Sequence, residues 1–432
     1  MKRVLIITYY WPPSGGAGVQ RWLKFVKYLP KFDYQPIVYT HENGEFPSID
    51  ESLVKEVPKE AVVLKTKIWE PYNIYKKVSG TKERINSGFL TEEKNKSKVV
   101  QNISTWIRGN LFIPDARKYW IKPSVKYLSD YISNNQIDVI ISTGPPHSMH
   151  LIALALKKKF DIPWIADFRD PWTNIDYYKD LKLSRMADNR HKRLEKSVLT
   201  KSDCVISVGS TLSEELLELG AIKVKTITNG YDSDDLIKGN VELDEKITIA
   251  HIGSFTKSRN PQLLLDVLDE LRATHPTVFN RLELKLIGKV DYSISEEFAR
   301  LKIDSLVRKI EYIPHEDVIV EQKKSHFLLL VVNDTPNAKG ILTGKVFEYL
   351  AARRPIIAIA PKDGDLANLI LETESGIVLD NSNKSDLREL LLKYVEDNTI
   401  VNKFTEGRIG QYSRESLTKD LVLLLDELTN KN

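Results

Sequence analysis

Residues 340–360 read GILTGKVFEYLAARRPIIAIA, and this stretch decides the fold class. Thr343 is a residue type favoured at a helix N-cap, so we expect the amides of Gly344 and Lys345 to lie unpaired at the positive end of a helix. Helical spacing places Glu348 on the same side, one turn further along, and turns the apolar residues away. The stretch therefore predicts a helix whose N-terminus binds phosphate, followed by a buried strand of a parallel sheet.

The charged residues of this helix allow two interpretations. A carboxylate at Glu348, one turn from a bound phosphate, can accept two hydrogen bonds from a ribose diol. The alternative is an ordinary solvated helix with a surface salt bridge between Glu348 and Arg353. A salt bridge explains the charges but leaves the Gly344-Lys345 start unexplained. The stretch therefore favours a site for a nucleoside diphosphate.

Short β-branched apolar runs alternate with helical patterns on both sides of this stretch, as in parallel sheets built from βαβ units. The first set of predicted strands comprises residues 4–8, 36–40, 62–65, 139–142, 164–167, 204–208 and 224–227. The second set comprises residues 247–252, 284–287, 310–313, 327–332, 355–360 and 376–378. We therefore expect an α/β protein of two doubly wound, Rossmann-like domains that face a central cleft.

A turn-rich stretch and the polar segment after it separate the two sets of strands, and we place the interdomain linker there. The sequence predicts an N-terminal, acceptor-binding domain at residues 1–235 with an insertion at about 66–130, where periodicity is weak. A C-terminal, donor-binding domain follows at residues 236–410. The last segment, 411–432, carries leucines on one helical face, so we expect it to pack back on the N-terminal domain.

The composition of the 432 residues is that of a globular enzyme, with 42% apolar and 28% charged residues. No run approaches the ~20 apolar residues of a membrane-spanning helix, and the first apolar run is too short for a signal peptide. The single cysteine, Cys204, excludes an intramolecular disulfide and favours a reducing cytoplasm. A net charge of +4 is small for this length, so we expect no nucleic-acid partner.

Basic residues outnumber acidic ones in the segment from Lys76 to Lys126. Apolar residues, among them Trp106 and Phe112, are interleaved with these charges. The combination is compatible with docking on an anionic membrane surface, so one expectation is a cytoplasmic enzyme on the inner face of a membrane. The alternative is a merely solvated face, since runs of charge usually lie in water.

In each predicted domain, a loop that contains glycine follows the first strand. In the sequence YYWPPSGGAG at residues 9–18, Gly15 and Gly16 let the backbone approach an anion. This loop lacks the Gly-x-Gly-x-x-Gly spacing of a dinucleotide site, and a tight strand-to-helix turn explains it equally well. In the sequence GSFTKSRNP at residues 253–261, Arg259 is placed to form bidentate bonds with a diphosphate, and surface charge on a loop is an equally good explanation.

The order of these landmarks resembles that of the retaining family 4 glycosyltransferases of the GT-B fold, of the kind that builds bacterial surface polysaccharides. The resemblance extends along nearly the whole chain and includes the glycine loop, Asn229-Gly230, residues 253–261 and residues 345–355. It implies transfer of a hexosyl or N-acetylhexosaminyl group from a nucleotide-sugar to a hydroxyl of a glycan or lipid-linked glycan. It implies no cofactor and no metal ion, because two cations and a helix dipole neutralise the leaving diphosphate.

The resemblance also implies roles for individual residues. Arg259 and Lys345 neutralise the donor diphosphate, and Glu348 binds the nucleotide ribose. Backbone groups near Ile313 contact the base. The complete set of implied donor-binding residues is Gly15, Gly16, Gly253, Ser254, Arg259, Ile313, Thr343, Gly344, Lys345 and Glu348.

The chain departs from the family pattern at two places. The family usually has two glutamates eight residues apart, and the residue eight positions before Glu348 is Gly340. The contact with the donor sugar normally made there is missing or relocated. The family also often has a histidine after a strand in the middle of the first domain, where this chain has IADFRDPW at residues 165–172.

Four residues of the first domain are therefore candidates for catalysis. Asp167, Arg169 and Asp170 lie in the usual place of the histidine, and a carboxylate there can orient the acceptor hydroxyl or accept its proton. A cap on the turn before Pro171 is an equally good explanation of Asp170. His147 follows another strand and opens on the same cleft, although a helix start and packing explain it without a ligand or a metal.

Three other functions share parts of this pattern. A nucleotide-sugar 2-epimerase has the same architecture but is expected to carry more acidic and histidine residues near the sugar. An NAD-linked dehydrogenase needs an acidic residue after the second strand, where this chain has Tyr39-Thr40-His41. A non-catalytic nucleotide-sugar binding protein stays open, because the first glutamate is absent.

Overall fold

The chain folds into two compact units. The computed structural model describes residues 1–46, 48–70, 98–236, 239, 241–311, 313–333, 335–405 and 408–430. Unit 1 comprises Met1–Thr228 and Leu417–Asn432, and unit 2 comprises Asn229–Ser416. The division therefore falls after Thr228, a few residues before the boundary that the sequence predicts, and the end of the chain belongs to unit 1.

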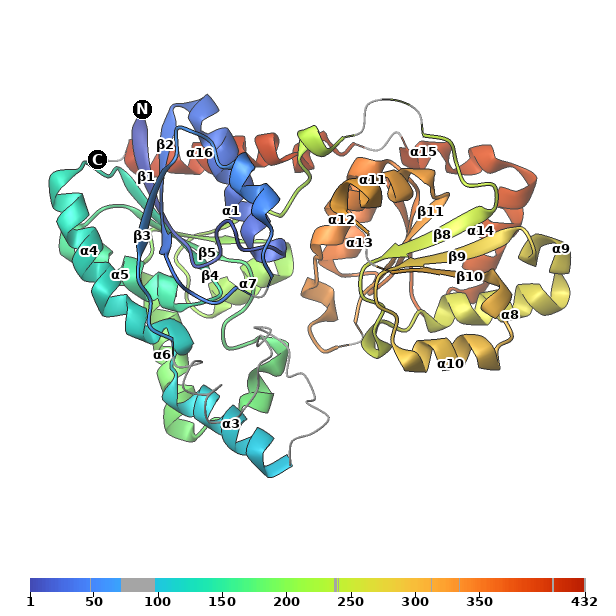
Figure 1. The fold of residues 1–432 in the computed structure, drawn as a ribbon, viewed down its shortest axis with the longest axis horizontal. Helices are drawn as coiled ribbons and strands as arrows, with labels where there is room; N and C mark the ends of the chain where they lie inside the picture. The colour runs from blue at the N-terminus through green and yellow to red at the C-terminus, as the bar shows by residue number, and fades with distance from the viewer. Residues whose placement is uncertain are drawn as a thin grey trace. The chain divides into compact units, whose positions relative to one another are not determined.

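Unit 1 contains a seven-stranded sheet with the order β3-β2-β1-β4-β5-β6-β7 (Figure 1). Its strands are β1 (Lys2–Ile7), β2 (Tyr34–His41), β3 (Val62–Thr66), β4 (Val139–Gly144), β5 (Trp164–Phe168), β6 (Cys204–Ser207) and β7 (Val224–Thr226). All neighbouring strands are parallel. Its helices are α1 (Ala17–Tyr28), α3 (Lys98–Leu111), α4 (Ile121–Asn134), α5 (Ser148–Phe160), α6 (Arg185–Lys201), α7 (Ser210–Glu218) and α16 (Arg414–Thr429).

Helices cover both faces of this sheet, because alternate residues of each strand point to opposite sides. Val4 and Ile6 of β1 pack with Leu421 of α16 and with residues of α1. Leu5 and Ile7 pack on the other side, with residues of α4 and α5. The final helix thus completes the core of unit 1 on the α1 side.

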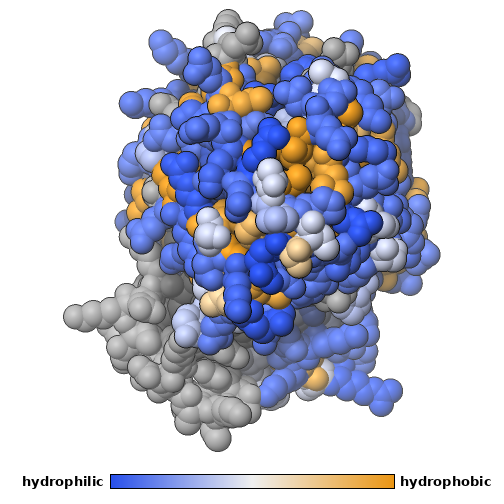
Figure 2. Space-filling view, turned by 90° about the vertical axis from the view of Figure 1, so that its right-hand side faces the viewer, coloured by the Kyte–Doolittle hydropathy of each residue, from blue (hydrophilic) through white to orange (hydrophobic). Residues whose placement is uncertain are grey.

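Unit 2 contains a six-stranded parallel sheet with the order β10-β9-β8-β11-β12-β13. Its strands are β8 (Ile247–Ile252), β9 (Leu282–Ile287), β10 (Val307–Ile310), β11 (Phe327–Val331), β12 (Ile356–Ile359) and β13 (Gly376–Leu379). Its helices are α8 (Gln262–Thr274), α9 (Pro276–Phe279), α10 (Tyr292–Arg300), α11 (His315–Lys324), α12 (Gly344–Ala352), α13 (Asp365–Glu372), α14 (Lys384–Glu396) and α15 (Asn402–Thr405). The face of unit 2 drawn in Figure 2 is mostly hydrophilic, with small separate hydrophobic patches, as on the surface of most globular proteins.

Short 3-10 helices connect many of these elements. They are η1 (Leu29–Phe32), η2 (Glu51–Glu56), η3 (Ala116–Trp120), η4 (Asp176–Leu181), η5 (Ser233–Asp235), η6 (Lys257–Arg259), η7 (Asp304–Leu306), η8 (Ala338–Gly340), η9 (Asn398–Val401) and η10 (Gly410–Tyr412). Two of them, η4 and η6, carry residues of the candidate sites described below.

The two parallel sheets confirm the predicted fold class of two Rossmann-like domains. One predicted strand was misplaced: β10 spans Val307–Ile310, whereas the pattern predicted residues 310–313. β10 is a short edge strand in which only the first and last residues are partly buried, so its hydrophobic signal is weak. Ile313 consequently lies beyond the strand, where its side chain packs against the core near α12.

The strand orders create one switch point in each sheet. β1 lies between β2 and β4, and β8 lies between β9 and β11, so the chain reverses its direction of winding beside β1 and beside β8. In open parallel sheets, ligands bind at the carboxyl ends of the strands where this reversal occurs. The loops after β1 and β4 in unit 1, and after β8 and β11 in unit 2, are therefore the places to examine.

The predicted basic segment is only partly described. Its residues 76–97 lie outside the described part of the chain. Arg117 is buried and forms an ion pair with Glu70 at 3.0 Å, so it is not a surface charge, whereas Lys122 and Lys126 are exposed. Association with a membrane surface stays a prediction. Among the described residues, no helix is both long and apolar enough to span a membrane.

Candidate functional site

Helix α12 in unit 2 begins where the sequence predicts, at Gly344. Thr343 has the extended backbone of an N-cap residue, with φ −72° and ψ 148°. Its hydroxyl nevertheless makes no capping hydrogen bond, and its Oγ1 is buried without a partner. The expected side-chain cap is therefore absent, and the first amides of α12 stay available for an anion.

Lys345 extends from the first turn of α12 across the end of strand β8. Its Nζ lies so close to Gly253, the residue after β8, that a Cβ at position 253 would overlap it. Gly253 also has φ +114°, a conformation that other residues rarely adopt. The positive φ therefore favours glycine at this position, and a Cβ there would also displace the end of the Lys345 side chain.

Two cations meet here without a carboxylate between them. Lys345 has no hydrogen-bond or ion-pair partner within the described residues. Burial and, to a smaller extent, the positive charge of Arg259 lower the pKa of Lys345 to about 8, with Glu348 opposing the shift. Arg259, in η6, donates from Nε to Asn333 Oδ1 at 2.7 Å. Because like charges repel when they lie this close, the pair indicates a place prepared for an anion.

The other predicted donor residues of unit 2 differ in whether the structure places them near Lys345 and Arg259. Glu348 is exposed on α12 one turn after Gly344, and Ser254 is exposed directly after Gly253. Gly253, Arg259 and Lys345 are brought together by the structure. Ile313 contributes its side chain to the core of unit 2, and no hydrogen bond involves its backbone in the described part of the chain.

Two residues that the sequence did not single out complete this part of unit 2. Asn333 follows β11 and holds the Arg259 guanidinium. His251, near the end of β8, is buried, with Nδ1 3.1 Å from the Leu329 carbonyl and Nε2 without a partner. Burial and the charge of Lys345 lower the pKa of His251 to about 3, so its ring is neutral. Only their positions at the switch-point strands could have indicated them.

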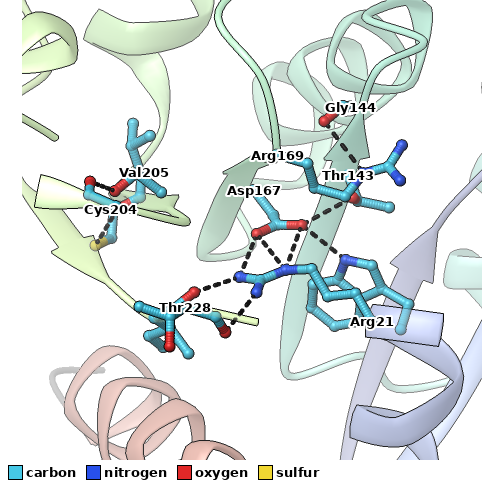
Figure 3. Close-up of polar contacts among 12 residues, drawn as sticks. Arg21, Thr143, Gly144, Asp167, Arg169, Cys204, Val205 and Thr228 are labelled. Atoms are coloured by element: carbon cyan, nitrogen blue, oxygen red, sulfur yellow. Dashed lines mark hydrogen bonds and ion pairs between the residues drawn. The ribbon is translucent and has the colours of Figure 1, made fainter. Parts of the chain in front are cut away.

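In unit 1, Asp167 is buried and paired within the protein, and its predicted catalytic role stays a prediction. Its buried carboxylate accepts hydrogen bonds from Arg21 Nη2 at 2.9 Å, Trp22 Nε1 at 2.8 Å and Thr143 Oγ1 at 2.8 Å (Figure 3). Burial alone would raise the pKa of Asp167, but the Arg21 guanidinium and these hydrogen bonds hold it below its ordinary value. Both carboxylate oxygens accept hydrogen bonds within the protein, and the lowered pKa keeps the group ionised.

Arg169 is likewise engaged by the protein. Its guanidinium donates from Nη1 to the Gly18 carbonyl at 2.9 Å, from Nε to the Gly144 carbonyl at 3.3 Å, and from Nη2 to the Pro145 carbonyl. These bonds join the start of α1 to the loop after β4. The predicted catalytic role of Arg169 stays a prediction, and these hydrogen bonds also position the two loops at the switch point.

The glycine loop after β1 is shaped by its two predicted residues. Gly16 stands at the N-cap of α1 with φ +91°, which favours glycine. The amide of Gly15 donates to the Ser48 carbonyl at 3.0 Å, and a Cβ at Gly15 would come within 2.8 Å of Ser48 Oγ. No side chain caps α1, so its first amides also lie open. Their contact with a donor stays a prediction.

His147 packs in the wall of a cavity. It is 8% exposed, and its ring stacks on Trp172 with centroids 4.4 Å apart. Burial lowers its pKa well below the ordinary value, so the ring is neutral. The capping of α5 falls to Asp115, which accepts from the Ser148 amide at 2.9 Å. Among the described residues, no cluster of three or more His, Cys, Asp or Glu side chains could hold a metal ion.

The cavity beside His147 has a volume of about 310 Å³. Asp170 lies exposed at this pocket and has no hydrogen-bond or ion-pair partner in the described ranges. Desolvation raises the pKa of Asp170, while the Arg169 charge opposes the shift. Of the four predicted catalytic residues, Asp170 alone keeps a carboxylate that a ligand can reach. Arg108 and Tyr177, which the sequence analysis missed, line the same pocket.

Family models match both halves of the chain. A model described as Glycosyltransferase Family 4 matches residues 89–235. A model described as Glycosyl transferases group 1 matches residues 232–415. A search of the curated proteins found no match.

Solved structures with the same architecture match along the whole chain. Sucrose-phosphate synthase from Thermosynechococcus elongatus is 14% identical, with a TM-score of 0.61 over 100% of this chain and 100% of its own. A mutant of S. aureus TarM, in complex with Fondaparinux, alpha-GlcNAc-glycerol and UDP, is 12% identical, with a TM-score of 0.61 over 99% of this chain and 100% of its own. Anabaena HepE in complex with UDP-glucose is 11% identical, with a TM-score of 0.58 over 99% and 100%. At these identities the similarity shows a common fold.

Proposed function

Because the chain belongs to the family 4-like glycosyltransferases of the GT-B fold, we propose that it moves a hexosyl or N-acetylhexosaminyl group from a nucleoside diphosphate-sugar to an acceptor hydroxyl. The donor binds to unit 2 and the acceptor, a glycan or lipid-linked glycan, to unit 1. The configuration at the anomeric carbon is retained. This activity needs no dissociable cofactor.

One observation carries the proposal: Lys345 and Arg259 lie together at the open N-terminus of α12, with no carboxylate paired to either among the described residues. A diphosphate supplies the missing negative charge. Arg259 offers its guanidinium for bidentate bonds, Lys345 a compact ammonium, and Gly344 a free amide. These groups act most strongly on the charge that develops as the nucleoside diphosphate leaves the sugar.

The acceptor chemistry falls to unit 1 in this proposal. Asp170 accepts a hydrogen bond from the acceptor hydroxyl and turns it toward the anomeric carbon. The bond from the anomeric carbon to the acceptor oxygen forms on the face that the diphosphate leaves, and the hydroxyl proton passes to the departing phosphate oxygen. No covalent sugar-enzyme intermediate is involved.

The bound ligands of two structural neighbours support a uridine nucleotide. TarM was solved with UDP, and HepE with UDP-glucose. We therefore propose UDP-sugars as the first donors to test. Gly340, which replaces the first glutamate of the family pattern, removes one contact to the sugar, so the identity of the sugar is the least constrained part of the proposal.

The test begins with ligand-induced stabilisation. Thermal unfolding is followed with UDP, GDP, ADP and CMP and with their sugar derivatives, and a ligand at ~100 times its Kd stabilises by ~2.7 kcal/mol. We expect one nucleoside diphosphate series to raise the transition temperature. If no nucleotide does so, the assignment of the donor site is wrong.

The reaction is then tested with labelled nucleotide-sugars and lipid-linked acceptors. We expect a new glycoside and one equivalent of free nucleoside diphosphate. Free nucleotide without a glycoside would contradict the transferase proposal and favour an epimerase or hydrolase. Asp170→Asn is expected to lower the rate of transfer by ~10²-fold while leaving nucleotide binding unchanged; an unchanged rate would remove Asp170 from the mechanism.

A further inference from the structure

The pocket of unit 1 has walls suited to a sugar ring. It is lined by five aromatic residues, Tyr10, Phe112, Trp172, Tyr177 and Tyr178, and its volume is about 310 Å³. That volume is at the lower end of the ~300–1,000 Å³ of small-ligand pockets, so one or two monosaccharide units fit. Aromatic faces carry partial negative charge and attract the C–H face of a sugar ring.

Packing holds the α3 side of this pocket in place. A Cβ at Gly109 would come within 2.8 Å of the Leu181 carbonyl oxygen. Glycine at this position therefore lets helix α3 approach the end of η4 closely. Asn110 accepts from the Ser184 amide at 2.7 Å and donates to the Lys182 carbonyl at 3.2 Å. Arg108 is therefore presented to the pocket from an anchored helix.

Several polar groups of the pocket are already engaged. Asp115 binds the Ser148 amide and hydroxyl, and the Tyr178 hydroxyl donates to Asp188 at 3.0 Å. The Trp172 indole donates to His191 at 3.1 Å. These bonds fix the walls and leave those groups with little to offer a ligand.

Three other groups that line the pocket form no hydrogen bond or ion pair in the described part of the chain: the Arg108 guanidinium, the Asp170 carboxylate and the Tyr177 hydroxyl. The buried ring atoms His147 Nδ1 and His191 Nε2 also lack a hydrogen-bond partner there. Arg108 and Asp170 do not form an ion pair with each other. Both act on Tyr177: desolvation and the Asp170 charge raise the pKa of its phenol, and the Arg108 charge lowers it. A cation and an anion that share a pocket without pairing leave room for a ligand with groups complementary to each.

Resting on the proposed function, we propose that this pocket holds an acceptor sugar that carries an anionic substituent. Arg108 binds the anionic group, a carboxylate or a phosphate, through its planar guanidinium. Asp170 and Tyr177 bind hydroxyl groups of the ring, and the aromatic walls pack against its apolar face. The acceptor is thus an acidic sugar and not a neutral one.

The test measures binding to the pocket without any donor. The probes are methyl glucoside, glucuronate and glucose 1-phosphate, and the readouts are saturation-transfer NMR and tryptophan fluorescence, since Trp172 lies in the pocket wall. We expect wild-type protein to bind one or both acidic sugars at least tenfold more tightly than the neutral glucoside. Preference for glucuronate identifies a uronic acid, and preference for glucose 1-phosphate identifies a sugar phosphate.

Substitutions in the pocket test which residues bind the acidic sugar. Arg108→Gln is expected to weaken binding of the acidic sugar by about tenfold or more, because it removes a charge-assisted hydrogen bond, and to leave the neutral glucoside unchanged. Arg193→Gln serves as the matched control, since Arg193 is exposed on α6 and does not line the pocket. Tyr177→Phe removes a single hydroxyl and tests the site independently if Arg108→Gln fails to fold.

Two outcomes would overturn the inference. One is equal affinity for the neutral and acidic sugars. The other is an acidic-sugar affinity that survives both Arg108→Gln and Tyr177→Phe. Thermal shifts by nucleotides are measured on the same samples, because they depend on unit 2. Intact nucleotide binding alongside either outcome contradicts this inference alone, whereas the absence of nucleotide binding contradicts the proposed function.

Discussion

Unit 1 and unit 2 each bury basic side chains near the switch point of their sheets, but they use them in opposite ways. In unit 1, Arg21 is 1% exposed and pairs with Asp167 at 2.9 Å, and it also donates to the carbonyls of Ile227 and Thr228. In unit 2, Lys345 has no partner among the described residues. Arg21 is buried and Lys345 is half-buried. The charge of Arg21 is neutralised by Asp167, whereas the charge of Lys345 is not neutralised by a paired carboxylate among the described residues.

The difference shows how a buried cation reveals its role. A buried guanidinium whose donors are matched by a carboxylate and by carbonyl groups fixes a backbone arrangement. A partly buried ammonium beside another cation lowers the free energy of unfolding. Such a pair is retained where binding of an anion to it serves the function of the protein. Four experiments test this contrast.

The largest expected effect is on the folding of unit 1. Arg21→Ala leaves the Asp167 carboxylate buried and uncompensated, so we expect the free energy of unfolding to fall by ~3–5 kcal/mol. All 7 tryptophans lie in unit 1, so denaturant unfolding followed by tryptophan fluorescence reports this unit. Lys192→Ala, which breaks an exposed ion pair with Asp188 within unit 1, is the control and should change stability by less than ~1 kcal/mol. An equally small loss of unfolding free energy for Arg21→Ala would contradict the structural role of Arg21 in unit 1.

The second effect is on catalysis in unit 2. Lys345→Met is expected to reduce kcat/KM with the nucleotide-sugar by ~10²–10³-fold, as for loss of one preorganised electrostatic group. Stability should stay the same or increase, because the variant removes a desolvated charge. Lys393→Met, at an exposed ion pair on α14, is the control for loss of a lysine. A large loss of stability without loss of kcat/KM would assign Lys345 a structural role.

The third effect is a dependence on pH. The pKa of Lys345 is lowered from 10.5 to about 8, so in the free protein this lysine is charged below pH 8 and increasingly neutral above it. Affinity for a nucleoside diphosphate should therefore fall as the pH rises through about 8, by up to ~tenfold per pH unit. In the free protein the unfolded chain binds more protons between about pH 8 and 10.5, so the contribution of Lys345 to stability rises over that window.

Calorimetric titration of UDP between pH 7 and 9.5 measures the change in affinity. Lys345→Met should give a flat profile over the same range, and this comparison separates Lys345 from other titrating groups. Parallel profiles for wild type and variant would show that another group controls the binding of the nucleotide.

The smallest effect concerns two helix starts. In unit 1 the Ser184 hydroxyl accepts from the Ala187 amide at 3.2 Å, so Ser184→Ala should cost ~1 kcal/mol of unfolding free energy. In unit 2 the Thr343 hydroxyl caps nothing, so Thr343→Ala should change the free energy of unfolding by less than ~0.5 kcal/mol. Thermal and denaturant unfolding of both variants decides the matter, and equal losses would mean that Thr343 caps α12 in solution.

The sequence predicted the fold well because strands of parallel sheets are continuous apolar runs between helices. It misplaced β10, whose outward-facing residues are Arg308 and Lys309 and whose buried content is small. The donor-site residues after β8 and in α12 were predictable because glycine and lysine there have no role in a core. Spacing also fixed the start of α12, although it did not reveal that the Thr343 hydroxyl makes no cap.

The acceptor side of unit 1 was harder to predict for a physical reason. Asp167, Arg169 and Asp170 are adjacent in sequence, but β5 turns Asp167 into the core, Arg169 meets carbonyls of two loops, and only Asp170 reaches the pocket. Arg108 lies on α3, far from them in the chain and in a segment without clear periodicity. Only tertiary structure brings it to the same cavity.

The return of α16 to unit 1 has a consequence for how the chain is made. All residues of unit 2 precede the apolar face of α16 that packs on Val4 and Ile6. During synthesis, unit 2 can fold as soon as it leaves the ribosome, while unit 1, although translated first, keeps one side of its sheet exposed until the last helix arrives. A chain interrupted after unit 2 would therefore carry a folded unit 2 and an incomplete, aggregation-prone unit 1.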